Sequence, residues 1–262
     1  MTIATFDQWI ASAKQVIPWS RTASRTTVAN RWFAIHDLAG NPGSATLAVG
    51  NTANGAVPTD ATAGFPGINF SSGLGYLSAV DFGNTVACRM TLYDRLFQAG
   101  AYNFNDAITL TAQPSFGGRV PSSNYAGLQI WLECVTAFTG NQSIAVTYTN
   151  QAGTAARTTG TIALGLAPTV GSMFLLPLQA GDTGVQKIES VTSTAASAGT
   201  FNIVVARPLW NGRVPGVNFG ECHGPDRTGL PQLFTDSALC VMLNADSTSS
   251  GLPDLSFDIV SA

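Results

Sequence analysis

The sequence predicts an all-β protein, a β-sandwich or jelly-roll-like fold preceded by one short N-terminal helix. Two observations carry this prediction. From about residue 24 onward, short alternating or apolar segments are separated by Gly, Pro and Asn, which is typical of strands joined by turns. Charged residues make up only 10% of the chain, against roughly a quarter in an average soluble domain. The 262 residues suffice for one large β domain or two of ordinary size.

The first segment is the one with helical spacing. Thr5 and Gln8 match a capping box, and Pro18 marks the end of the helix. Such a helix either packs on the β body or docks on a partner. If it docks, we expect Phe6, Trp9 and Ile10 to bind the partner. The apolar residues that define the helix are Phe6, Trp9, Ile10, Ala13 and Ile17.

Thirteen later segments carry strand patterning. So many short strands with frequent turns indicate a sandwich or a barrel. The segments are 26–35, 45–49, 77–82, 86–93, 107–111, 127–138, 143–149, 158–164, 173–177, 185–191, 200–206, 238–244 and 255–260.

The strands also suggest an internal repeat. The segment that begins at Gly75 aligns with the one that begins at Gly184, and the turn-rich segment around Gly40 aligns with that around Gly140. The tetrapeptide GRVP occurs twice, at 118–121 and 212–215, with a different offset. Two related sandwiches in tandem explain this pattern. The alternative is chance similarity between segments rich in Thr, Gly and Ala.

The tandem interpretation divides the chain at AQPSFGGRVPSSNYA, whose Pro, Ser and Gly residues mark a linker or a long loop. The expected parts are an N-terminal helix and arm (1–23), a first β-sandwich (24–111), the linker (112–126) and a second β-sandwich (127–262).

Charge and hydropathy argue against two classes of partner. The net charge is −3, and Lys14 and Lys187 are the only lysines beside ten scattered arginines, so we expect no direct nucleic-acid binding. No apolar run approaches the roughly 18 residues of a membrane helix. The N-terminus also lacks the basic and apolar regions of a signal peptide. We therefore expect a protein made in the cytoplasm that does not contact a membrane.

The cysteines show no metal or redox pattern. No two of them form a C-x-x-C pair, and the chain is too long to resemble a small disulfide scaffold. We expect buried free thiols. The four residues are Cys88, Cys134, Cys222 and Cys240.

The stretch ECHGPDRTG, which begins at Glu221, is the strongest candidate for a reactive site. Cys222 and His223 are neighbours, and neighbouring residues of an extended segment point to opposite faces, which argues against a catalytic dyad. Glu221, His223, Asp226 and Asp236 offer mixed metal ligands, but their spacing matches no known metal loop. Because Gly and Pro bracket the charged residues, we interpret the stretch as a structured loop.

No other motif carries chemistry. His36 is interpreted as a residue at a strand end beside a turn. The chain has no G-x-S-x-G, H-E-x-x-H or Walker motif. The prediction is a non-enzymatic protein with no catalytic residues, no cofactor and no metal site.

Several runs resemble structural proteins encoded in tailed-bacteriophage genomes, and the resemblance covers most of the chain. It implies a virion structural role, without choosing between capsid decoration, head–tail joining and tail or fibre parts. The long helix expected of a tailed-phage major capsid protein is not seen in the sequence. The runs are TASRTTVANRWFAIHDLAGNPG, VPTDATAGFPGINF, LYDRLFQAGAYNF and DRTGLPQLFTDSALCVMLNADSTSSGLPDLSFDI.

Among these roles we expect a capsid decoration, or cement, protein that bridges neighbouring shell subunits. Its expected partners are the major capsid protein or other virion proteins, and its expected state is a homo-oligomer, with a trimer favoured. The alternative is a tail or fibre component that binds a host surface glycan through exposed aromatics such as Trp210 and Tyr125. A third hypothesis is a hydrolase that uses Asp226, Glu221 or His223.

Overall fold

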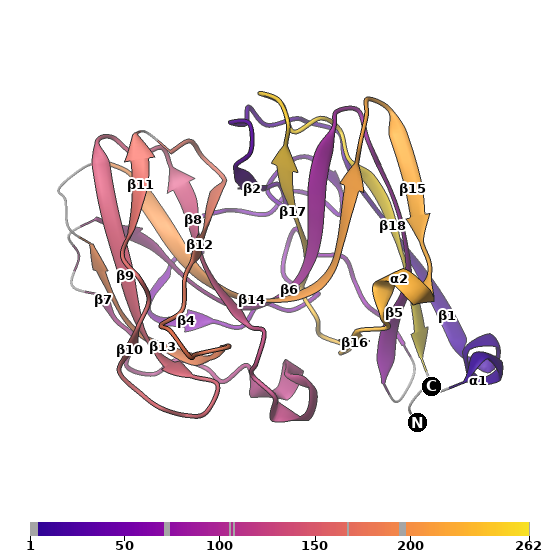
Figure 1. The fold of residues 1–262 in the computed structure, drawn as a ribbon, viewed down its shortest axis with the longest axis horizontal. Coiled ribbons are helices and arrows are strands. Elements are labelled where there is room, and N and C mark those ends of the chain that lie inside the picture. The colour runs from indigo at the N-terminus through magenta and orange to yellow at the C-terminus, as the bar shows by residue number, and fades with distance from the viewer. Residues whose placement is uncertain are drawn as a thin grey trace.

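The computed structural model describes residues 5–70, 74–104, 106, 108–166, 168–193 and 198–261. It confirms the predicted fold class, an all-β protein with a short N-terminal helix. Two β-sandwiches lie side by side (Figure 1). A seven-stranded sheet, the shared sheet, supplies one layer of each. A six-stranded terminal sheet and a five-stranded middle sheet supply the other layers, and they give the terminal sandwich and the middle sandwich their names.

The terminal sheet contains the first and last strands described. Its order is β15-β5-β18-β1-β3, and β16 pairs with β5. Along β1, Ile17, Trp19 and Arg21 are buried while the residues between them are not, because alternate side chains of a strand face opposite sides of the sheet. The strands are β1 (Ala13–Arg21), β3 (Gly40–Asn41), β5 (Gly75–Asn84), β15 (Phe219–His223), β16 (Gln232–Leu233) and β18 (Asp254–Ser261).

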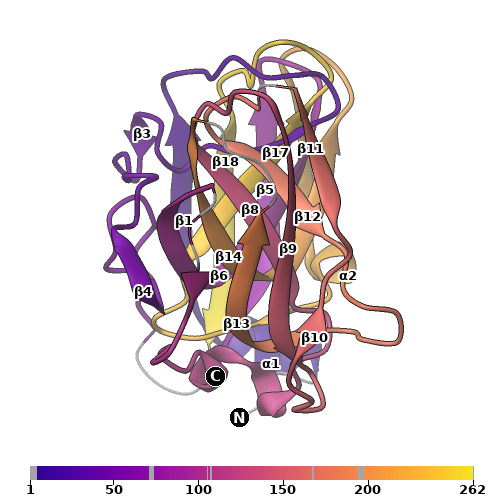
Figure 2. The same ribbon diagram turned by 90° about the vertical axis from the view of Figure 1, so that its left-hand side faces the viewer.

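The middle sheet has the order β10-β9-β13-β7, and β11 pairs with β9. In the side view, β9 and β13 lie in front of β8 and β14 of the shared sheet (Figure 2). The inward residues of β9 are Ile144, Val146 and Tyr148. The strands are β7 (Ile108–Thr109), β9 (Asn141–Asn150), β10 (Arg157–Thr158), β11 (Ile162–Leu166) and β13 (Val185–Ser193).

The shared sheet joins the two sandwiches. Its order is β14-β8-β12-β2-β17-β6-β4, and a further pairing of β14 with β6 closes six of these strands into a ring. The two longest strands, β6 and β14, pair along their length and run from one sandwich to the other (Figure 1). The strands are β2 (Trp32–Ala34), β4 (Asn51–Ala56), β6 (Cys88–Asn103), β8 (Gln129–Thr136), β12 (Ser172–Leu176), β14 (Thr200–Val214) and β17 (Leu239–Ala245).

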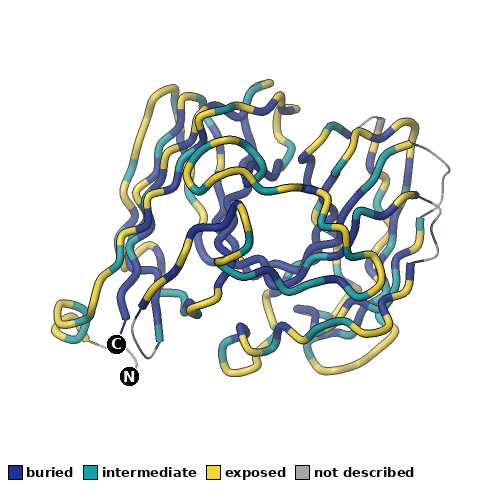
Figure 3. The backbone as a smooth tube through the Cα atoms, turned by 180° about the vertical axis from the view of Figure 1, so that it is seen from behind, coloured by how far each residue is buried: buried dark blue, intermediate teal, exposed yellow. Residues whose placement is uncertain are grey.

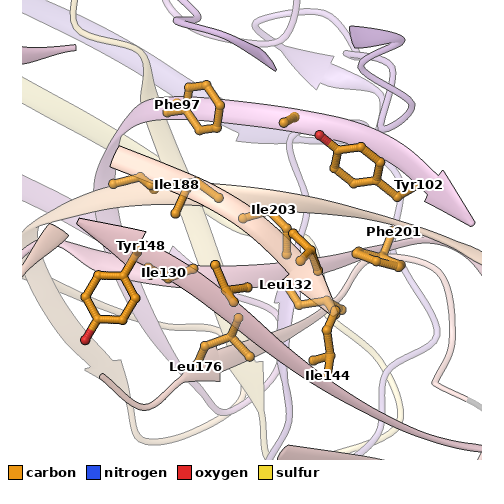
Figure 4. Packing of buried hydrophobic residues seen from close by; sticks show 14 of the residues in the cluster. Phe97, Tyr102, Ile130, Leu132, Ile144, Tyr148, Leu176, Ile188, Phe201 and Ile203 are labelled. Carbon is orange, nitrogen blue, oxygen red and sulfur yellow. The ribbon is translucent and has the colours of Figure 1, made fainter. Parts of the chain in front are cut away.

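Each sandwich has its own apolar core. In the middle sandwich, Leu132 and Ile203 of the shared sheet pack toward Ile144 and Ile188 of the middle sheet (Figure 4). In the terminal sandwich, Leu92 of the shared sheet packs in one cluster with Phe257 of the terminal sheet. Burial of a side chain of this size contributes about 1.5–3 kcal/mol, so these clusters carry most of the stability of the fold.

A third core lies inside the ring, between the sandwiches. Its residues come from the terminal sandwich (β2, β6, β17), from the middle sandwich (β8, β12, β14) and from the loop before β4. It therefore holds the two sandwiches together. The buried members are Ala34, Leu47, Tyr93, Trp131, Met173, Val204, Ala206 and Met242.

The N-terminal helix is shorter than the sequence predicts. Helix α1 (Phe6–Ala11) has the predicted capping box of Thr5 and Gln8, but the continuation to Ile17 was wrong, because β1 begins at Ala13. Eight residues of β1 pair with β18, and these tertiary bonds override the helical spacing. Pro18 is tolerated inside β1 because β3 pairs only with Ser20 and Arg21, which leaves an unpaired edge beside it.

Most predicted strands overlap strands of the structure, but 158–164 falls on two short strands, β10 and β11, with a gap between them. The segment 45–49 is not a strand, and only 32–34 of 26–35 belongs to one. The strands that were not anticipated are β1, β3, β4, β15 and β16. Ala107, the first residue of one predicted strand, lies outside the described residues. The remaining helical turns are α2 (Pro225–Thr228), η1 (Gly117–Arg119) and η2 (Pro121–Ser123).

The two sandwiches have matching connectivity. The terminal sandwich has β5-β18-β1 over β6-β17-β2, and the middle sandwich has β13-β9-β11 over β14-β8-β12. The alignment of Gly75 with Gly184 therefore matches equivalent strands, β5 and β6 with β13 and β14. The alignment of Gly40 with Gly140 does not, because β9 follows Gly140 and only the two-residue β3 lies at Gly40.

The repeat is circularly permuted, so the expected division of the chain does not follow the sandwiches. The middle sandwich is contiguous, from β8 to β14, apart from small strands. The terminal sandwich starts with β1, β2, β5 and β6 and is completed by β17 and β18 at the end of the chain. Both 24–111 and 127–262 thus contribute to it, because β18 lies between β1 and β5. The expected linker, 112–126, contains η1, η2 and the buried Arg119.

Candidate functional site

The stretch ECHGPDRTG forms the end of β15 and the single turn α2, with Gly229 in the left-handed conformation (φ 68°) as its cap. The His223 ring is buried against Phe82 and Trp210. Trp210 Nε1 donates to its Nδ1 (2.9 Å). Its Nε2 lies 3.3 Å from Glu221 Oε1 and 3.1 Å from Arg227 Nη1. Both nitrogens are engaged, which fits a structural histidine.

Cys222 points away from His223. It is exposed while His223 is buried, as the alternation of a strand requires. A hydrogen bond with Asp81, together with partial burial, raises the pKa of the Cys222 thiol to about 11. A thiol with so high a pKa is a weak nucleophile at neutral pH. Cys222 thus departs from the expectation of buried thiols, which holds for Cys88, Cys134 and Cys240.

The metal ligands considered at this stretch do not converge. Among the described residues, no group of three or more His, Cys, Asp and Glu side chains is placed to hold a metal ion. Asp226 is exposed on α2, and the backbone carbonyl of Asp236 accepts from Arg119.

His36 belongs to a buried ionic cluster inside the ring. Arg95 donates to both carboxylate oxygens of Glu133, at 2.9 and 2.7 Å. Asn202 donates to the same carboxylate (2.7 Å) and to the carbonyl of Leu47. His36 Nε2 lies 3.9 Å from Glu133, and its ring stacks on Phe65. The interpretation of His36 as a strand-end residue beside a turn missed this burial, since its partners are far away in the sequence.

The pKa values of this cluster follow from its burial and its pairing. Burial lowers the pKa of His36 to about 4, although the charge of Glu133 opposes the shift. Burial alone raises the pKa of Glu133, but the charge and hydrogen bonds of Arg95 outweigh it and lower the value to about 2. At neutral pH the cluster is thus an Arg95–Glu133 ion pair beside an uncharged His36. The cluster is closed to solvent, and its ion pair joins β6 to β8, so it acts as structure.

A second buried cluster surrounds Asp94. Arg119 and Arg207 lie 3.1 and 3.4 Å from its carboxylate. Ser237 Oγ and the backbone N–H of Ala238 donate to it. Arg119 comes from the first GRVP copy, so that tetrapeptide provides a structural anchor. In the second copy the arginine, Arg213, is exposed.

The predicted partner-binding residues lie at one corner of the molecule. Trp9 packs against Tyr76 and Val260 of the terminal sheet and thereby anchors α1. Phe6 and Ile10 remain 71% and 54% exposed. Figure 3 shows helix α1 as mostly exposed, close to the two ends of the chain.

Val16 extends this apolar corner onto β1. Lys14 lies over the Trp9 ring, and Val16, two positions on and therefore on the same face of β1, is 62% exposed. We name Phe6, Ile10 and Val16 the α1 patch. The exposure of Val16 was not foreseen, because the sequence placed it in the helix.

A groove of about 630 Å³ lies on the opposite side of the shared sheet from the terminal core. Arg213 of β14 pairs in register with Arg89 of β6, Arg89 with Asn244 of β17, and Asn244 with Trp32 of β2. These side chains form one row across four strands and share a face. Tyr93, Thr91 and Asn211 continue the lining, and Gln129 closes it from the middle sandwich.

The groove was missed by sequence reasoning. Its lining residues are separated by up to 195 positions along the chain, from 32 to 227, and no linear motif joins them. The register of four strands brings them together.

No protein-family model matches this sequence, and no curated protein matches it. Solved structures that match include particles of infectious bursal disease virus. The T13 particle is 7% identical, with 96% of this chain and 78% of that chain covered and a TM-score of 0.21. The VP2 subviral particle is 10% identical, with 96% and 81% covered and a TM-score of 0.19. TM-scores this low do not establish a common fold.

Among the helices of the described residues, none is both long and apolar enough to cross a membrane.

Proposed function

We propose that this protein is a non-enzymatic structural component of a virion, and specifically a capsid decoration protein that docks on shell subunits through the α1 patch. The observation that carries the proposal is the patch itself. Phe6 and Ile10 are 71% and 54% exposed on helix α1, which Trp9 fixes to the sheet, and Val16 is 62% exposed on the adjoining strand β1. Apolar side chains that are rigidly presented to solvent favour association with another protein.

The charged groups of the interior support a structural role. Glu133 with Arg95, and Asp94 with Arg119, are buried pairs that hold strands together. His36 and His223 are buried beside partners in the same way. Groups that catalyse hydrolysis must reach a substrate, and Glu133, Asp94 and His36 are closed to solvent.

The sequence resemblance to tailed-bacteriophage structural proteins supports the virion assignment. The proposal places the protein on the outside of a capsid after synthesis in the host cytoplasm, with the major capsid protein as its partner. A low charge density suits repeated contacts between many copies. We include a small homo-oligomer, a trimer, in the proposal, since one protein that bridges several shell subunits is most simply symmetric.

Cosedimentation with capsids that lack the protein tests the proposal. We expect saturable binding to mature shells, compared with unexpanded procapsids in parallel. The double variant Phe6→Ser/Ile10→Ser should lose most of this binding. Val217→Ser is the matched control, because Val217 is also 71% exposed but lies in the turn between β14 and β15. Absence of binding to either shell, or equal loss in both variants, contradicts docking through α1.

A tail or fibre component that binds a host glycan is the second candidate. The aromatics first considered for it do not form a platform, because Trp210 is only 4% exposed and Tyr125 packs against Phe116. The groove at Arg89 and Arg213 favours this candidate instead, since it is open and lined by an aromatic ring and polar groups.

A further inference from the structure

We propose that the groove on the shared sheet binds an acidic saccharide of at least two sugar units, with a sugar carboxylate on Arg89 and Arg213 and a sugar ring on Trp32. The inference rests on the groove alone and holds whether or not the α1 patch docks on a capsid.

The two arginines are the first argument. Arg89 and Arg213 lie directly opposite each other on β6 and β14, where like charges destabilise a sheet. Among the described residues, neither makes an ion pair, a hydrogen bond from its side chain or a ring contact. The other eight arginines each make at least one of these contacts. Two adjacent unpaired guanidinium groups fit a carboxylate, which each can bind through two hydrogen bonds.

The charge balance of the groove is the second argument. Arg89, Arg213 and Arg227 line it, and Glu221 is the acid that faces them. Arg227 already binds Glu221 (3.0 Å), so the unbalanced positive charge belongs to Arg89 and Arg213. The whole chain carries a net charge of −3, which makes this local excess of positive charge a feature of the groove and not of the general surface.

The lining selects a saccharide among anionic ligands. Trp32 is half-buried and held edge-on against Trp131, so its ring is fixed before any ligand arrives. Gln129 accepts from Tyr93 and Trp131 through its carbonyl oxygen. Its amide nitrogen donates to none of the described residues. A fixed aromatic ring beside free amide donors suits the apolar faces and hydroxyl groups of sugars.

The geometry sets the minimum size. From Arg213 to Trp32 the row crosses three strand spacings, roughly 14 Å in all. One sugar ring does not span that length, whereas two or three do. The volume of about 630 Å³ falls within the range of roughly 300–1,000 Å³ that is typical of ligand sites.

Two other anionic polymers fit less well. An acidic peptide would add a strand to the open edge of β14, but Pro208 has no N–H to offer there, and Pro215 follows the strand end. A nucleic-acid strand binds in a groove whose positive charge follows the backbone over several nucleotides. Here the unpaired charge is confined to the Arg89 end of the row.

Isothermal titration with oligosaccharides tests the inference. The probes are oligosaccharides of glucuronic acid, galacturonic acid and sialic acid, with neutral maltotriose and lactose, a Glu-rich peptide, a single-stranded oligothymidylate and inorganic phosphate in parallel. We expect at least one acidic oligosaccharide to bind saturably with one site per chain and to weaken as salt rises. The neutral sugars should bind at least about tenfold more weakly, since each charge-assisted hydrogen bond contributes that much or more.

Variants locate the site. Arg89→Gln/Arg213→Gln and Trp32→Ala should each lower the affinity about tenfold or more. Lys187→Gln, which removes one positive charge from β13 outside the groove, should leave it unchanged. Thermal unfolding checks that each variant is folded. Unchanged affinity in the arginine variant, binding by none of the acidic sugars, or equal binding by the peptide, the oligothymidylate or phosphate overturns the inference.

Discussion

Arg95 of β6 and Glu133 of β8 form a two-point ion pair inside the ring of strands, with both side chains buried. The pair joins the strand that starts in the terminal sandwich to a strand of the middle sandwich. His36, Asn202 and Cys240 surround it. Both charges are thus closed to solvent, and each is the counter-charge that stabilises the other.

Removal of one partner from this pair should be costly. We expect Glu133→Gln to lower the free energy of unfolding by about 3–5 kcal/mol, because Arg95 then remains buried without its counter-charge. Chemical denaturation measures the change. Asp226→Asn, on the exposed turn α2, is the control and should stay within about 0.5 kcal/mol. A loss of under about 1 kcal/mol in Glu133→Gln contradicts the role assigned to the pair.

His36 should make stability depend on pH. Its pKa is about 4 in the folded protein and 6.5 ordinarily, so the unfolded state binds more protons between these values. The free energy of unfolding should therefore fall, by roughly 1–3 kcal/mol, as the pH drops from about 6.5 to about 4. Denaturation at several pH values measures this slope, and His36→Gln should flatten it. An unchanged slope in the variant assigns the dependence to other groups.

Glu133 should act at lower pH. Its pKa of about 2 lies below the ordinary 4.5, so its contribution to stability is present above about pH 4.5 and is lost as the pH falls toward 2. The two losses thus follow each other as the protein is acidified, first His36 and then Glu133.

Repulsion between Arg89 and Arg213 should lower the free energy of unfolding. Arg213→Gln removes the repulsion from Arg89, and we expect a gain of about 0.2–1 kcal/mol at low salt. The gain should shrink in 1 M salt, because exposed charges are then screened. Arg227→Gln is the control, since it breaks the bond to Glu221 and should not stabilise. Thermal unfolding at two salt concentrations distinguishes these outcomes. If Arg213→Gln destabilises the protein, Arg89 and Arg213 do not repel each other as proposed.

Thiol labelling should find one reactive cysteine. Cys222 is exposed and the other three are buried, so native protein should react with one equivalent of a thiol reagent and unfolded protein with four. Reaction at Cys222 should be slow at neutral pH, because its pKa is about 11. Asp81→Asn removes the main cause of that shift and should speed the reaction. If the native Cys222→Ser variant is still labelled, another cysteine is the reactive one and the prediction is wrong.

Some elements could be predicted because their signals are local. The alternation of β9 and the capping box of α1 are set by neighbours within a few residues, and the structure has both. β1 was taken for a helix, because Phe6 to Ile17 fits helical spacing while the strand bonds of Ala13 to Ser20 come from β18, more than two hundred positions away.

The sequence by itself determined the all-β class, the near absence of helix and the similarity of β5–β6 to β13–β14, because hydrophobic alternation and turn residues act over short distances. Only the tertiary structure decided that the repeat is permuted, that six strands close into a ring and that Arg89, Arg213 and Trp32 share one face. Strand register and the return of β17 and β18 to the first sandwich set these features. They depend on which distant strands pair, and the pattern of a single segment does not encode its partner.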